Sequence, residues 1–401
     1  MEQRRILFVP LDWGLGHATR ILPLIREAVA AGDRVWIGGN GRSGAWLRSR
    51  FPELPFEEAP AWTPVHRGSL VVDFVRGIAG YWRSLKADRE WAREVAGRLQ
   101  LTHLVSDHRL GLRADRDRIG QDDVQNVLVI HQLTIALPLL WRCPGIMQWF
   151  SVLLWEMLRP YWSSFHEIWI PDSSQRSLAL APHLSMLPWV WDGALWSAKR
   201  GQDGKMPCFR YLGWCSRFEG MSSIDKGGME ERPPEESAIL VVLSGPEPAR
   251  SRLETKVIAQ WQSWGDVQDS SKSHARPTTL WLVRGVPDAK NTVEGFPMVK
   301  GLKVWNSPDD QTMYSLLTHA DWIVGRPGYS SLMDYACLRS TATRSKPWRL
   351  CTVPASGHSE QAYLGFRLKR LGQADFRSET AFDLHSAWLD RIKFKFTYAF
   401  S

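Results

Sequence analysis

The histidine at position 17 lies in the sequence context most suggestive of chemistry. His17 follows Gly14 and Gly16 in the stretch WGLGH, shortly after an all-apolar run that is typical of a buried parallel strand. In open α/β sheets, ligands bind where such strands end. An imidazole there can take a proton from a hydroxyl group near neutral pH. Two interpretations follow: a general base, or a histidine that caps the next helix.

Three glycine-containing turns, each between an expected strand and an expected helix, are candidate anion sites. They span residues 13–17, 244–250 and 326–331. A helix N-terminus offers unpaired N–H groups and a partial positive charge, and glycine lets the backbone approach a phosphate closely. None of the turns matches GxxxxGK[ST] or GxGxxG, which argues against the interpretation as an ATPase or as a dinucleotide-dependent oxidoreductase. Three such turns in one chain indicate a cleft that binds a nucleotide diphosphate.

Acidic residues near these turns are the next candidates. Asp334 lies about one turn into the helix expected after Ser330, where its carboxylate could hold both hydroxyls of a ribose; the alternative is an acidic residue favoured there by the helix dipole. Glu360 and Gln361 follow a strand and a glycine turn, and their alternative is a solvated helix start. Residues 115–117 match the metal-binding pattern DxD, but their charge-rich surroundings predict a solvated loop. We therefore predict no catalytic metal.

The chain is long enough for two domains and has ordinary globular composition, with 401 residues of which 44% are apolar and 23% charged. Short apolar strands alternate with amphipathic helices in both halves, which predicts an α/β fold of two Rossmann-like, doubly wound domains. A polar stretch with Gly, Pro and acidic residues separates the halves. We place the N-terminal domain at 1–215, the linker at 216–236, the second domain at 237–375, and at 376–401 a tail able to pack back on the first domain.

Charge and cysteine content exclude several classes of protein. The net charge of +8 is modest; it suits an anionic small ligand or an anionic membrane surface, and no nucleic-acid motif accompanies it. The five cysteines are odd in number and lack CxxC spacing, which argues against a zinc site or a disulfide framework. The chain start lacks the apolar core of a signal peptide, and no uncharged apolar run reaches about 18 residues. We expect a cytoplasmic protein without a nucleic-acid partner.

Residues 146–162 form a short, aromatic and amphipathic segment. Trp and Tyr favour membrane interfaces, so this segment could lie on a bilayer as a peripheral contact. The alternative is a packed helix of the core. The shortage of Lys and Arg on its polar face favours the packed helix.

Seven motifs occur in an order that resembles the GT-B glycosyltransferases. The resemblance covers residues 4–372 and is strongest to glycosyltransferase family 28, which includes the UDP-N-acetylglucosamine transferase of lipid-linked peptidoglycan precursor synthesis. It implies two Rossmann-like domains facing a cleft, with the donor held mainly by the second. The motifs are GxGHxxR, SDHRLGL, HQ, YLGWCSRF, LSGPEPAR, GRPGYSSLMD and VPASGHSEQAYLG.

The resemblance assigns roles to individual residues. His17 matches a histidine proposed as the base or as part of the acceptor site, and Arg217 matches an arginine that touches the donor diphosphate. Asp334 stands where the family often has a ribose-binding glutamate, and the prolines of SGPEPAR replace glycines. Spacing and resemblance together give a catalytic residue, His17, and a donor-binding set: Gly14, Gly16, Arg217, Ser244, Gly245, Arg326, Gly328, Tyr329, Ser330, Asp334, Glu360 and Gln361.

The resemblance implies a metal-independent sugar transfer that needs no cofactor. A nucleotide-sugar donor, UDP-linked as in UDP-N-acetylglucosamine, would give its sugar to a hydroxyl acceptor that is lipid-linked or a polysaccharide. Helix N-termini and Arg217 would stabilise the departing diphosphate. This implies a role in the cell envelope at the inner face of the cytoplasmic membrane. Two alternatives stay open: a hydrolase that uses water with the same histidine, and a non-catalytic protein that binds nucleotide sugars.

Overall fold

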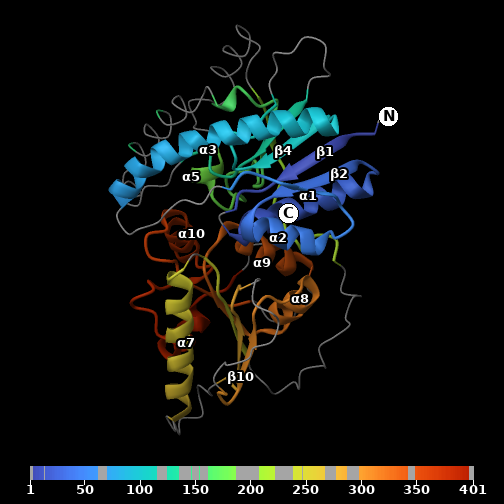
Figure 1. Ribbon diagram of the computed structural model, residues 1–401. Helices are drawn as coiled ribbons and strands as arrows, with labels where there is room; N and C mark the ends of the chain where they lie inside the picture. Colours follow the sequence, from blue (N-terminus) through green and yellow to red (C-terminus); the bar gives the residue numbers. More distant parts are fainter. Residues whose placement is uncertain are drawn as a thin grey trace. The chain divides into compact units, whose positions relative to one another are not determined.

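The computed structural model places most of the chain in two compact units, Met1–Cys215 and Ser216–Ser401, each with its own parallel sheet (Figure 1). Residues 222–236 of the expected linker, the DxD stretch, and most of residues 146–162 lie outside the described residues. The structure describes residues 3–12, 14–61, 70–114, 124–134, 146, 153, 161–186, 207–221, 238–245, 247–266, 277–286, 298–341 and 348–396.

The first unit is built on a seven-stranded parallel sheet in the order β3-β2-β1-β4-β5-β6-β7. The chain first winds outward from β1 and then returns to add β4 on its other side. The strand order therefore reverses between β1 and β4, which is where doubly wound sheets bind their ligands. The strands are β1 (Arg5–Val9), β2 (Arg34–Gly39), β3 (Phe56–Glu58), β4 (His103–Asp107), β5 (Gln125–Val129), β6 (Glu167–Ile170) and β7 (Cys208–Tyr211).

Helices cover both faces of this sheet, because successive side chains of a strand point to opposite faces. Ile6 and Phe8 of β1 pack in a cluster with the helices α1 and α2. Leu7 and Val9 pack instead with the C-terminal part of α3. Both faces of the strand are thus buried, which explains its uninterrupted apolar sequence. The named helices of this unit are α1 (Leu15–Ala30), α2 (Gly41–Arg50), α3 (Leu70–Leu99) and α5 (Pro182–Ser185).

The second unit repeats this plan with six parallel strands in the order β10-β9-β8-β11-β12-β13. The order here reverses between β8 and β11, which pair in parallel from Trp322 opposite Ile239 to Gly325 opposite Val242. The α/β, doubly wound prediction is therefore confirmed in both units. The strands are β8 (Ala238–Val242), β9 (Thr279–Val283), β10 (Leu302–Trp305), β11 (Trp322–Gly325), β12 (Leu350–Thr352) and β13 (Asp375–Phe376).

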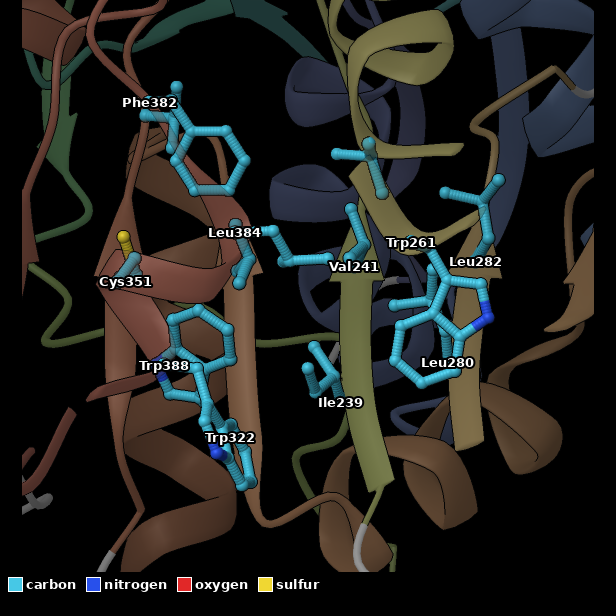
Figure 2. Packing of buried hydrophobic residues seen from close by; sticks show 14 of the residues in the cluster. Ile239, Val241, Trp261, Leu280, Leu282, Trp322, Cys351, Phe382, Leu384 and Trp388 are labelled. Carbon is cyan, nitrogen blue, oxygen red and sulfur yellow. The ribbon is translucent and has the colours of Figure 1, made fainter. Parts of the chain in front are cut away.

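Aliphatic and aromatic side chains pack together in one layer of the second sheet's core (Figure 2). Trp388 lies in this layer, with its ring centroid 5.7 Å from that of Trp322 on β11 and 6.4 Å from that of Trp264. Residues 376–396, treated above as a separate tail, therefore supply part of this core. The helices of this unit are α7 (Ala249–Asp266), α8 (Asp310–His319), α9 (Tyr329–Thr341), α10 (Ser359–Arg370), α11 (Leu384–Asp390) and the 3₁₀ helix η4 (Arg391–Lys393).

The N-terminus of α11 offers a test of this placement. The carboxylate of Asp383 accepts a hydrogen bond from the backbone N–H of Ser386 at 2.7 Å and so caps the helix. We expect Asp383→Ala to lower the free energy of unfolding by about 1 kcal/mol, since that is the typical value of such a cap. Urea unfolding of the variant measures this loss. Asp309→Ala, which removes the equivalent cap of α8, is the matched control and should cost a similar amount; no loss in Asp383→Ala would contradict the docking of α11.

Candidate functional site

The switch point of the first sheet gathers the histidine of the glycine turn and the residues that end two neighbouring strands. His17 lies in the first turn of α1, directly after β1, and Asp107 is the last residue of β4. His131 follows β5 by two residues. Because β1, β4 and β5 are adjacent and parallel, their carboxyl ends share one edge of the sheet.

His17 and Asp107 form a hydrogen-bonded pair at this edge. The Nδ1 atom of His17 lies 2.9 Å from Oδ1 of Asp107. The side chain of His17 is 16% exposed, whereas that of Asp107 is fully buried. When Nδ1 donates its proton to the carboxylate, the other ring nitrogen, Nε2, keeps the lone pair that a base needs. The pair therefore has the geometry of a general base held by a carboxylate.

A buried cation and two further imidazoles surround the pair. Arg20, only 1% exposed, donates from Nε to Oδ2 of Asp107 at 2.8 Å and from Nη1 to Nδ1 of His131 at 2.6 Å. Burial alone would raise the pKa of Asp107, but Arg20 and His17 outweigh it and hold that pKa well below its usual range. Burial, reinforced by Arg20, lowers the pKa of His108 and His131 well below their usual value. The site thus combines an ionised carboxylate at Asp107 with two neutral imidazoles, those of His108 and His131.

A metal ion is another conceivable occupant of this edge. His17, Asp107 and His108 each offer one ligand atom, and these atoms lie within 4.8 Å of one another. The residues nevertheless fit a cation poorly, because the guanidinium of Arg20 contacts both oxygens of Asp107. A second positive charge would be repelled at that distance in a buried site.

The glycine turn before α1 is fixed by the start of α2. Gly14 has a φ of +125°, a conformation that L side chains rarely adopt, and nothing lies within 4 Å of the position of an added Cβ. The hydroxyl of Ser43 donates to the carbonyl of Gly14 at 3.0 Å, and the backbone N–H of Ser43 donates to Asp12 at 2.9 Å. Gly14 and Gly16 are both exposed, so the backbone of this turn is open to a ligand.

The second unit brings its glycine turns together at one edge of its own sheet. Ser244 and Gly245 follow β8, while Arg326 and Gly328 follow β11, so these turns flank the switch point. Gly245 is exposed with a φ of +97°, and nothing lies within 4 Å of an added Cβ. α9 begins at Tyr329, which is buried, and Ser330 in its first turn is half-buried.

The turn after β12 joins this edge from the next strand. Gln361 accepts a hydrogen bond at Oε1 from the backbone N–H of Ala355, at 2.9 Å. That contact uses the glutamine oxygen to hold the turn in place. Glu360 lies half-buried in the first turn of α10. Strand adjacency thus gathers the three predicted segments of the second unit, which are spread over residues 244–361 of the sequence.

Two residues that were predicted to bind the donor, Arg326 and Asp334, use their side chains in hydrogen bonds and ion pairs within the protein. The side chain of Arg326 is fully buried; it donates to the carbonyls of Val353 at 2.9 Å and Ala249 at 2.8 Å, and Nη2 lies 2.9 Å from a carboxylate oxygen of Glu379. These contacts connect the turn after β11 with the start of α7 and the turn after β12. Arg326 therefore positions the backbone of these turns.

The side chain of Asp334, the second of these residues, contacts the start of the second unit. It accepts hydrogen bonds from the hydroxyl of Ser216 at 2.8 Å and from the backbone N–H of Arg217 at 3.3 Å. The Nε atom of Arg217 lies 3.0 Å from the other carboxylate oxygen. Burial raises the pKa of Asp334, and the charge of Arg217 opposes this rise. The structure brings the predicted ribose residue and the predicted diphosphate arginine together as an ion pair.

Four residues of these sites were not singled out for a role from the sequence: Asp107, Arg20, His131 and Glu379. The first three lie within the motifs SDHRLGL, GxGHxxR and HQ, so the motifs contained a usable signal. Two of those motifs follow an apolar strand with a polar side chain; of these strands β4 lies next to β1, and β5 lies next to β4. Glu379 gave no such signal, because it lies in a polar turn after β13.

No family model matches the chain, and neither does any curated protein sequence. Solved structures do match. The glycotransferase of kitacinnamycin superposes with a TM-score of 0.57 at 13% identity, over 97% of this chain and 91% of that one. UGT2 of Phytolacca americana, in complex with UDP-2fluoro-glucose and pterostilbene, gives 0.55 at 12% identity over 97% and 89%. MurG of Acinetobacter baumannii gives 0.50 at 10% identity over 98% and 92%.

These similarities extend over nearly the whole of each chain and show the fold alone. The protein has the two-sheet α/β fold of the GT-B glycosyltransferases. Within the part of the chain that the structure describes, no helix combines the length and apolar character needed to cross a membrane.

Proposed function

We propose that this protein is a glycosyltransferase that moves a sugar from a nucleotide-sugar donor to a hydroxyl acceptor without a metal. The observation that carries the proposal is the hydrogen bond between His17 and the buried carboxylate of Asp107, at the switch point of a doubly wound sheet. A structural helix cap would not require a buried, ionised partner on a neighbouring strand. The same pair suits a base that must be neutral and oriented before it accepts a proton.

In the proposed transfer, residues at the edge of the first sheet supply the base, and turns at the edge of the second sheet bind the leaving diphosphate. Nε2 of His17 takes the proton of the acceptor hydroxyl, and the oxygen attacks the anomeric carbon of the donor sugar. The bond from that carbon to the diphosphate oxygen breaks, and the nucleotide diphosphate leaves with the electron pair. Backbone N–H groups at Ser244 and Gly245 and the N-terminus of α9 supply positive potential for the departing charge. Arg326 contributes by holding these turns.

The donor class rests on the neighbours and the acceptor class on sequence resemblance. One matching structure holds a UDP-sugar analogue, and the quoted motifs resemble family 28, so we propose a UDP-linked donor, with UDP-N-acetylglucosamine as the first candidate. Lipid-linked and polysaccharide hydroxyls are the acceptors to examine, at the inner face of the cytoplasmic membrane. Contact with that membrane would be peripheral.

Release of UDP tests the proposal. The full chain is incubated with UDP-N-acetylglucosamine or UDP-glucose, with and without a lipid-linked or polysaccharide acceptor, and both UDP and glycosylated product are measured. We expect UDP release that depends on the acceptor and matches the product formed. Stoichiometric free sugar and UDP without acceptor would assign a hydrolase instead. Donor binding without turnover under any condition would assign a binding protein.

A further inference from the structure

We infer that Arg20 is a positioning residue: through Asp107 it fixes the proton of His17 on Nδ1 and leaves Nε2 as the basic nitrogen. The inference rests on the proposed function only for its activity readout. Arg20 lies one helical turn after His17 on α1 and is buried, so its guanidinium faces the same sheet edge as the imidazole.

The guanidinium of Arg20 donates hydrogen bonds to both oxygens of the Asp107 carboxylate. Arg20 donates from Nε to Oδ2 of Asp107 at 2.8 Å and from Nη2 to Oδ1. Such a two-point contact fixes the plane of the carboxylate as well as its charge. Oδ1 is then directed at His17, whose Nδ1 lies 2.9 Å away. A carboxylate that is both ionised and immobile selects the imidazole tautomer that can donate to it.

The contact between Arg20 and His17 itself admits the opposite tautomer. Nη2 of Arg20 also lies 2.9 Å from Nδ1 of His17. If Nδ1 accepted from Nη2, its lone pair would face the anionic Oδ1 of Asp107 at hydrogen-bond distance. Such a contact between two acceptors is unfavourable, whereas a proton on Nδ1 turns it into a hydrogen bond to a carboxylate that already accepts from Nη2. The proton therefore belongs on Nδ1 of His17.

The other end of the guanidinium determines a second tautomer. Nη1 of Arg20 lies 2.6 Å from Nδ1 of His131, and a guanidinium can only donate. His131 therefore carries its proton on Nε2. Nε2 of His108 lies 3.1 Å from the same Nδ1 of His131, and the backbone N–H of His131 donates to it at 3.4 Å. The groups that face His17 are thus Arg20 from its own helix, Asp107 and His108 from the end of β4, and His131 after β5.

Long-range ¹H–¹⁵N spectra of the histidine rings test this arrangement in the full chain, with signals assigned by His17→Asn and His131→Asn. In the wild type we expect His17 protonated on Nδ1 and His131 protonated on Nε2. Arg20→Met should convert both signals to tautomer mixtures and lower kcat by about 10²-fold, within the range for general acid–base catalysis. Arg4→Met, which removes an exposed arginine paired with Asp33, is the matched control and should leave spectra and kcat unchanged.

Arg20→Lys keeps the inference testable if Arg20→Met does not fold. Lysine can donate to one carboxylate oxygen but cannot also hold His131 through a planar fork. We expect a folded variant with the His131 signal changed, and kcat reduced about tenfold because part of the base orientation is lost. Wild-type ring tautomers in Arg20→Lys, or His17 protonated on Nε2 in the wild type, would overturn the inference. Tautomer changes in a protein that transfers no sugar would leave it standing and refute the proposed function.

Discussion

Replacing His17 by alanine is expected to lower kcat for sugar transfer by about 10²- to 10⁴-fold, the range that a positioned general base contributes. The loss should appear in kcat while donor affinity stays unchanged, because the proposed donor turns belong to the second unit. Initial rates of UDP release at saturating donor, with calorimetry for donor binding, measure the two effects separately. Asp107→Asn should give a comparable loss, since an amide in place of the carboxylate no longer fixes the donating nitrogen of His17.

A histidine elsewhere on the same sheet supplies the control. His103 begins β4, at the opposite end of the strand from Asp107. His103→Asn should therefore keep the wild-type kcat. The N-cap of α1 is Gly14 and no side chain caps the helix, so His17 is not a helix cap. Retained activity in His17→Ala would remove the base from the mechanism and leave His17 only its structural contact with Asp107.

Replacing Arg326 by methionine is expected to lower the stability of the second unit by about 3 kcal/mol, the lower end of the cost of removing one partner from a buried ion pair. The substitution removes the donors to the carbonyls of Val353 and Ala249 and leaves the carboxylate of Glu379 without this buried partner. Urea titration followed by hydrogen exchange of peptides from residues 238–396 reports on this unit separately. Donor binding should weaken as well, because the turns after β11 and β12 lose their connection.

Arg252 makes a matched control with the same carboxylate. Its Nε lies 3.1 Å from the other oxygen of Glu379, but its side chain is 55% exposed. Arg252→Met should cost no more than about 1 kcal/mol, the upper value for exposed pairs. Equal losses in Arg326→Met and Arg252→Met would mean that burial of Arg326 does not matter, and the positioning role of Arg326 would then be withdrawn.

The sequence predicted those parts of the fold that depend on short stretches of residues. The apolar run at Ile6–Val9, the glycine turns and the alternation of strands with helices are short-range features, and parallel sheets with helices on both faces are their usual outcome. The sequence also predicted that the glycine turns of the second half lie close together at one edge of the sheet. Once strands are parallel and adjacent, the segments after β8, β11 and β12 must share an edge.

The sequence could not predict which partners the buried charged side chains contact, because those partners lie far away along the chain. The sequence predicts Arg326 as a donor ligand from its glycine turn, and Asp334 from its place one turn into the following helix and from the resemblance. Their partners lie 53 and 118 residues away, at Glu379 and Ser216. The role of Arg20 depends likewise on Asp107, 87 residues further along the chain. Spacing within one motif cannot show which buried charge will pair with which.

The second unit is proposed to bind a nucleotide diphosphate at the turns that flank the switch point of its sheet. Hydrogen exchange of the full chain, with and without a saturating UDP-sugar, tests it most directly. We predict slower exchange in peptides containing Ser244–Gly245, Gly328–Ser330 and Glu360. Unchanged exchange at all three turns, with protection elsewhere in the chain or nowhere, would contradict the account.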